Sequence, residues 1–153
     1  MDDKPREIRL RGRLVSALYT EAMLLADEAR AYFDQYGKAE RAPLDPFARV
    51  NFSCESLKVT TRLMHVLAWL LTERSVEMGQ MTREAALSSQ RRLGDAVESD
   101  PQVVATLPAQ AIALIEATND LYWRVRRLDD EAPFPTPAAS PALGLLDRLE
   151  RAF

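Results

Sequence analysis

Cysteine, histidine and glycine are scarce in this chain, and their scarcity excludes several kinds of site. The 153 residues include 1 Cys, 1 His and 5 Gly. A lone Cys cannot form an intramolecular disulfide, and one Cys with one His cannot supply the four ligands of a structural zinc site. Neither a phosphate-binding loop nor a G-x-G-x-x-G motif occurs in the sequence. We therefore expect neither a metal ion nor a cofactor.

An excess of basic charge and a long apolar run are also missing. The net charge is -3 and the pI is near 5.3, whereas nucleic-acid-binding domains are usually basic. The most apolar stretch, residues 63–71, contains His65 and is flanked by Arg62 and Arg74, while a membrane-spanning helix takes about 20 mostly apolar residues. Residues 1–13 lack the apolar core of a secretory signal. We expect a cytoplasmic protein that binds neither membrane nor nucleic acid.

The residues that are present favour one helical domain. Hydrophobic residues make up 47% of the chain, which is enough for a single core. The mixed charges of residues 1–13 predict a flexible N-terminal segment. Apolar periodicity then predicts a first helix from about Leu14 to Tyr36, followed by Gly37 as a left-handed C-terminal residue. Its apolar stripe comprises Val15, Leu18, Ala22, Leu25, Ala29, Tyr32 and Tyr36.

Two further long helices follow. Asp45 and Pro46 predict the N-cap and first turn of a second helix that ends near Gly79. Pro108 begins a third, which runs to about Asp130. Its stripe comprises Ala111, Leu114, Thr118, Leu121, Val125 and Leu128, widened by Ile115 and Tyr122.

Between these two helices the sequence predicts a short helix and a loop. Thr82 opens a helix over residues 83–93, and Gly94 ends it. Residues 95–107 contain Asp100, Pro101 and scattered polar residues, which predict a loop.

The stretch Ser53–Leu71 of the second helix is apolar on two adjacent sides, which indicates contacts from two directions. The first stripe, which we assign to the core, comprises Val50, Cys54, Leu57, Thr61, Met64, Ala68, Leu71, Ser75 and Met78. The second comprises Val59, Leu63, Val66 and Leu70, and a polar line comprises Lys58, Arg62 and His65, with Trp69 beside them. We predict a homodimer with Leu63, Trp69 and Leu70 in its interface; burial of Trp69 against a loop or the short helix stays open.

The chain changes character after Glu131. Residues 132–141 contain four prolines and predict a polyproline-type linker. The following dozen residues are too few for a stable helix alone, so they must fold back on the body or on another molecule. We predict partner binding through one face of this tail, formed by Leu143, Leu146, Leu149 and Phe153. The domains are thus residues 1–13, 14–131 and 132–153.

No catalytic residue can be assigned. Cys54 and His65 lie eleven residues apart on one helix, which corresponds to about 16 Å of rise and excludes a hydrogen-bonded pair within one chain. The Glu-x-x-His repeats of metal-binding bundles are absent, since Arg62 stands three residues before His65. We predict that the protein is not an enzyme.

The run Asn51–Leu71, which includes SCESLKVTTRLMHVLAWLL, resembles the signature helix of the alphaproteobacterial regulator of CtrA degradation (RcdA-like) family. The segments Glu28–Phe33 (EARAYF) and Leu121–Leu128 (LYWRVRRL), with Pro43 and Pro46, support the resemblance over roughly residues 14–130. It implies a non-enzymatic, dimeric adaptor. Such adaptors help to present cell-cycle regulators, CtrA among them, to the ClpXP protease together with other adaptor proteins.

The predicted fold is all-α: an antiparallel bundle of three long helices, with one short extra helix and a flexible Pro-rich C-terminal tail. Two other functions stay open. A small-molecule or cofactor-binding bundle would use Thr61, Ser75 and Thr118 as inward polar groups. DNA binding would use the short helix and the basic residues of segment 1–13, with a strong dependence on salt.

Overall fold

The computed structural model describes residues 4–131. No strand occurs between Lys4 and Glu131, so the all-α prediction is confirmed for this part of the chain. The elements are α1 (Lys4–Ala31), a π-helical turn η1 (Tyr32–Tyr36), α2 (Gly37–Arg41), α3 (Pro46–Glu77), α4 (Arg83–Ala86), α5 (Pro101–Val104) and α6 (Ala109–Glu131).

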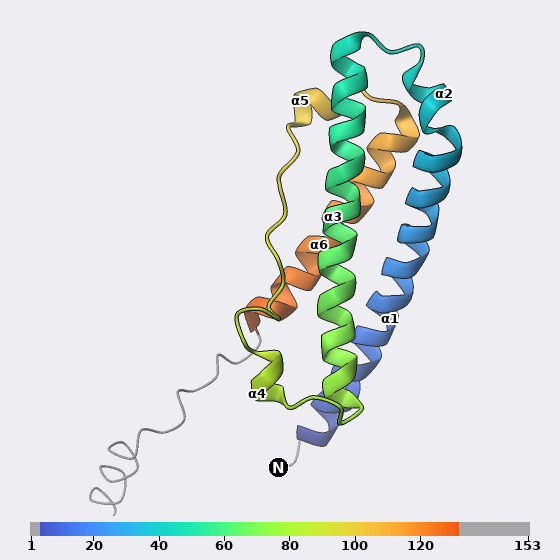
Figure 1. The fold of residues 1–153 in the computed structure, drawn as a ribbon. Helices are drawn as coiled ribbons and strands as arrows, with labels where there is room; N and C mark the ends of the chain where they lie inside the picture. Colours follow the sequence, from blue (N-terminus) through green and yellow to red (C-terminus); the bar gives the residue numbers. More distant parts are fainter. Residues whose placement is uncertain (1–3, 132–153) are drawn as a thin grey trace, which may run out of the picture.

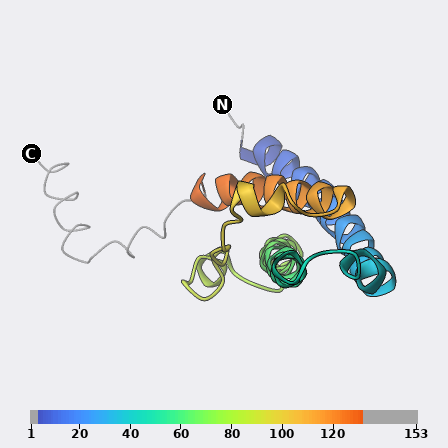
Figure 2. The same cartoon turned by 90° about the horizontal axis from the view of Figure 1, so that it is seen from above.

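The three long helices α1, α3 and α6 lie side by side, and each contacts the other two (Figures 1 and 2). The antiparallel prediction is correct for α1, because Arg11 of α1 bonds Glu73 late in α3 while Tyr32 meets Phe52 early in α3. It is wrong for α3 and α6. Hydrogen bonds join residue 62 to residue 118 and residue 69 to residue 129, so these two helices run in the same direction.

The connection between α3 and α6 explains their parallel orientation. The chain leaves the end of α3, forms α4, and then returns along the length of α3 to α5 before α6 begins (Figure 1). We call residues 87–100 of this connection the return segment. A parallel pair of neighbouring helices needs such a return, whereas antiparallel neighbours need only a short loop.

The first helix begins ten residues earlier than the sequence predicts. Residues 4–13 belong to α1, where the sequence indicated a frayed segment. The reason lies in the contacts with α3: Arg11 donates to the buried Glu73 at 3.3 Å, and Gly12 packs so closely that a Cβ there would lie 2.5 Å from Oε1 of Glu77. The charged side chain of Arg11 therefore contributes to the contact between α1 and α3.

The end of the first helix also differs. Gly37 has φ of -54°, which is right-handed helical geometry, and the chain continues through it into α2. The π-helical turn before it shifts the phase of the helix by adding a residue to one turn. As a result Gly37 is buried near the ring of Phe52, and Tyr36, predicted on the inner stripe, is 56% exposed.

The predicted caps of α3 are confirmed. Asp45 accepts a 2.8 Å hydrogen bond from the backbone N–H of Ala48, and Gly79 has φ of +73° just beyond the last turn. The helix after Thr82 ends at Ala86, far short of the predicted Leu93. The predicted loop 95–107 contains the single turn α5, which Asp100 caps by accepting from the N–H of Gln102.

One core joins the long helices and the return segment. From α6 it takes the predicted stripe, of which only Leu128 is half-buried. From α3 it takes the second apolar stripe, not the first. The tail that begins at residue 132, with Leu143, Leu146, Leu149 and Phe153, lies outside the described residues.

Candidate interaction surface

A row of large apolar side chains runs along the outside of α3. Five of them recur at every seventh residue and are 49–67% exposed: Val50, Leu57, Met64, Leu71 and Met78. Between them Cys54, Thr61 and Ala68 are exposed and Ser75 is half-buried. The sequence-based assignment of this stripe to the core is therefore wrong. We call these nine residues the α3 row.

The spacing of the α3 row suits contact with another helix. Residues seven apart stand about 10 Å from one another on one side of a helix, and the whole row is about 42 Å long. Alternation of large and small residues at four-three spacing is the pattern by which helices interlock along a seam. Contiguous exposed apolar surface of this kind marks an interaction site.

The hydroxyl groups in the α3 row do not interrupt its apolar character. Thr61 donates to the carbonyl of Leu57 and Ser75 donates to that of Leu71, both at 2.9 Å. Each hydroxyl proton is thus used within the helix. These two residues and the buried Thr118 do not converge on one inner site, since Thr61 is exposed, so the arrangement predicted for a ligand-binding core is not formed.

The three residues predicted in a dimer interface lie instead in the core of a single chain. Leu63, Trp69 and Leu70 are 5%, 3% and 0% exposed. The indole N–H of Trp69 donates a 2.8 Å hydrogen bond to the carboxylate of Asp129 on α6. These side chains are occupied by contacts within the chain, so a second copy would have to meet α3 elsewhere.

The inward side of α3 carries the predicted polar line. Arg62 is 1% exposed and donates to the Ser99 hydroxyl at 2.7 Å and to the Thr118 hydroxyl at 3.4 Å. Ser99 in turn donates to the buried Glu55 at 2.5 Å, and Lys58 pairs with Glu55 at 2.8 Å. Burial lowers the pKa of Arg62, and the nearby Glu55 opposes this shift. This network fastens the return segment to α3.

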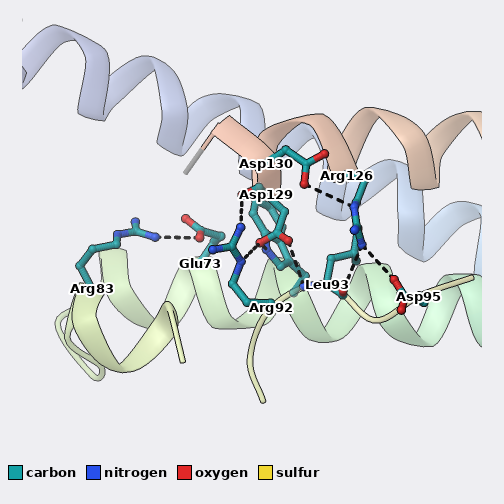
Figure 3. Close-up of polar contacts among 9 residues, drawn as sticks. Glu73, Arg83, Arg92, Leu93, Asp95, Arg126, Asp129 and Asp130 are labelled. Atoms are coloured by element: carbon teal, nitrogen blue, oxygen red, sulfur yellow. Dashed lines mark hydrogen bonds and ion pairs between the residues drawn. The ribbon is translucent and has the colours of Figure 1, made fainter. Parts of the chain in front are cut away.

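A second polar cluster fastens the other end of the return segment (Figure 3). Asp129, 4% exposed, accepts from Trp69 and from Arg92 at 2.8 Å each, and its other carboxylate oxygen faces the N–H of Leu93 at 3.4 Å. Arg126 reaches Asp95 at 3.3 Å. The two clusters together hold residues 92–99 across α3 and α6.

Sequence reasoning did not find the buried acidic groups. Glu55, Glu73 and Asp129 are 2%, 7% and 4% exposed, yet in the sequence they resemble ordinary surface charges of helices. For the two acids of α3 the sequence does carry a signal, which is helical spacing. Glu55 and Glu73 lie on the same side of α3 as Val59 and Val66, together with Arg62 and Trp69. A charged residue on an otherwise apolar stripe implies an ion pair within the core.

The lone Cys and His do not form a catalytic site. Cys54 is exposed on the α3 row, whereas His65 is half-buried beneath Gly94, where a Cβ would lie 2.8 Å from the imidazole. Over residues 4–131, no group of three His, Cys, Asp or Glu side chains could hold a metal ion. In the same range, no helix is both long and apolar enough to cross a membrane.

Comparison with known proteins gives a matching family and a similar solved structure. The family described as "Protein of unknown function (DUF1465)" matches residues 7–153. The chain is also similar to the crystal structure of RcdA from Caulobacter crescentus CB15, with 36% sequence identity over 76% of this chain and 88% of that chain, and a TM-score of 0.63. No curated protein matches the sequence.

Proposed function

Since this chain belongs to the DUF1465 family and is RcdA-like, we propose that it is a non-enzymatic adaptor that assists ClpXP-dependent proteolysis of cell-cycle regulators. The family assignment confirms the resemblance that Asn51–Leu71 indicated. On this proposal the protein acts in the cytoplasm by holding other proteins: the protease, further adaptors and the regulator to be degraded.

The α3 row is the observation that carries this proposal. Its five large side chains recur at every seventh residue, and the fold leaves them on the surface. Apolar surface that the chain does not use for its own core supports a role in binding protein. We assign the row to the homodimer, in which two copies of α3 interlock through Val50, Leu57 and Met64.

The tail supplies the second part of the proposal. Leu143, Leu146, Leu149 and Phe153 remain our proposed contact with partners, on a linker that raises the local concentration of the apolar face near a bound protein. The α3 row thus serves self-association, and the tail serves the capture of partner proteins.

Protein lifetimes in the source bacterium test the adaptor role. We expect removal of this chain to lengthen the half-lives of a small set of regulators after protein synthesis is stopped. CtrA is the first candidate among these regulators. Each of them should also be stabilised when ClpX is depleted. The wild-type chain should restore turnover, and a chain that ends at Glu131 should not. Unchanged half-lives across the proteome would refute the proposal.

A further inference from the structure

A cleft of about 470 Å³ lies between the second half of α3 and the segment that follows α4. Its apolar lining includes Ala68 and Leu71 of the α3 row together with Met81, and α3 also contributes His65, Thr72 and Ser75. Arg91 and Arg92 line the cleft from the segment that follows α4. The volume falls within the range of sites that bind side chains or small ligands.

The charge of this cleft is opposite to that of the protein. The chain has a net charge of -3, yet none of the described residues that line the cleft is acidic. Asp129 pairs with the guanidinium of Arg92 at 2.8 Å, while Arg91 is exposed. The cleft therefore suits a ligand that combines apolar side chains with a carboxylate.

The C-terminal end of α6 lies beside this cleft. Asp129 bonds two residues that line it, Trp69 and Arg92, and α6 ends two residues later at Glu131 (Figure 3). The ten residues 132–141 follow, and at about 3.1 Å per polyproline-type residue they reach roughly 30 Å. Residues 142–153 can thus return to the cleft without strain in the linker.

The sequence of residues 142–153 matches both the apolar lining and the basic charge of the cleft. Helical spacing places Leu143, Leu146, Glu150 and Phe153 on one side, at intervals of three, four and three. Glu150 is thus an acid on an apolar face, which requires a basic partner when that face is covered. Leu145 falls outside this face.

We propose that residues 142–153 dock in this cleft of their own chain, with leucines against Ala68, Leu71 and Met81 and with Glu150 facing Arg91. The inference deepens the proposed function and rests on it, because it gives the tail a resting place from which a partner must displace it. Docking covers Leu71, so a docked tail and a second copy of α3 exclude each other at this end of the α3 row.

Hydrogen exchange of the purified full-length chain, without any partner, tests this docking. In the Leu143→Ser/Leu146→Ser variant, amides of residues 83–94 should exchange several-fold faster than in the wild type, because the covering segment is lost. Leu145→Ser makes the same kind of change outside the docking face and should leave exchange unchanged. The docking is refuted if the double variant and Leu145→Ser give equal exchange over residues 83–94.

A charge exchange tests the predicted ion pair. Glu150→Arg and Arg91→Glu should each accelerate exchange over residues 83–94, and the two together should restore protection. Failure of the double variant to restore protection would overturn the assigned pairing. Protection should also be independent of protein concentration; a rise with concentration would mean that the tail of a second copy occupies the cleft, contrary to the proposal. Since no partner is present, a negative result leaves the adaptor function standing.

Discussion

Trp69 on α3 and Asp129 on α6 are joined by a 2.8 Å hydrogen bond from the indole N–H to the carboxylate, although 60 residues separate them in the sequence. The same carboxylate binds Arg92 of the return segment. One buried acid therefore joins three parts of the chain. Both of its side-chain partners, Trp69 and Arg92, line the cleft.

Asp129→Ala should destabilise the protein by about 3–5 kcal/mol, because it leaves the Arg92 guanidinium and the Trp69 N–H without this buried acceptor. Asp130→Ala is the matched control: its carboxylate is exposed and pairs with Arg126 one turn away on the same helix, so the substitution should cost less than about 1 kcal/mol. Urea unfolding of both variants measures the difference. Equal stabilities would show that the Asp129 cluster does not support the fold.

Ser99→Ala tests the network around Arg62. The Ser99 hydroxyl accepts from Arg62 and donates to Glu55, so its removal takes one hydrogen bond from each of two buried charged groups, which keep Thr118 and Lys58 as their other partners. We expect a loss of about 1–3 kcal/mol in the free energy of unfolding. Ser89→Ala, at an exposed position of the same connection, should be close to neutral. If Ser99→Ala were equally neutral, the network would have no structural role.

Tyr32 should make the protein sensitive to alkaline pH. Burial raises the pKa of its phenol, and nearby Glu40 raises it further. The neutral form is thus favoured in the fold, so this contribution to stability is complete below the unfolded pKa of about 10 and is lost as pH rises through the folded pKa.

The measurement is urea unfolding of the wild type and Tyr32→Phe on both sides of that pKa. The phenylalanine variant cannot ionise, so it should lose less stability on the alkaline side than the wild type does. Tyr36→Phe, at an exposed tyrosine, serves as the control and should behave as the wild type. Parallel losses in all three proteins would contradict the role of Tyr32.

The positions of helices could be predicted from the sequence where local signals decide them. Asp45 with Pro46 marked the start of α3, and Pro108 marked that of α6. The early start of α1 could not be predicted, because residues 4–13 are held by contacts with Glu73 and Glu77, far away in the sequence. The continuation through Gly37 depends on the π-helical turn, which no local signal announced.

The two sides of α3 were assigned in reverse for a physical reason. The sequence favours an apolar stripe for the core and a stripe with Arg62 and Trp69 for the outside. In the fold, Arg62 donates hydrogen bonds to Ser99 and Thr118, and Trp69 donates one to Asp129, so the polar stripe can be buried. Hydropathy cannot distinguish a stripe that packs within the chain from one that packs against another molecule.

The α3 row gives the most direct test of the whole account, through the molecular mass and melting temperature of a Leu57→Glu/Met64→Glu variant. Both side chains are more than 60% exposed. We predict that sedimentation equilibrium gives a dimer for the wild type and a monomer for the variant, with melting temperatures within a few degrees of each other. A large loss of melting temperature would place the row in the core. An unchanged molecular mass would show that no second copy binds there.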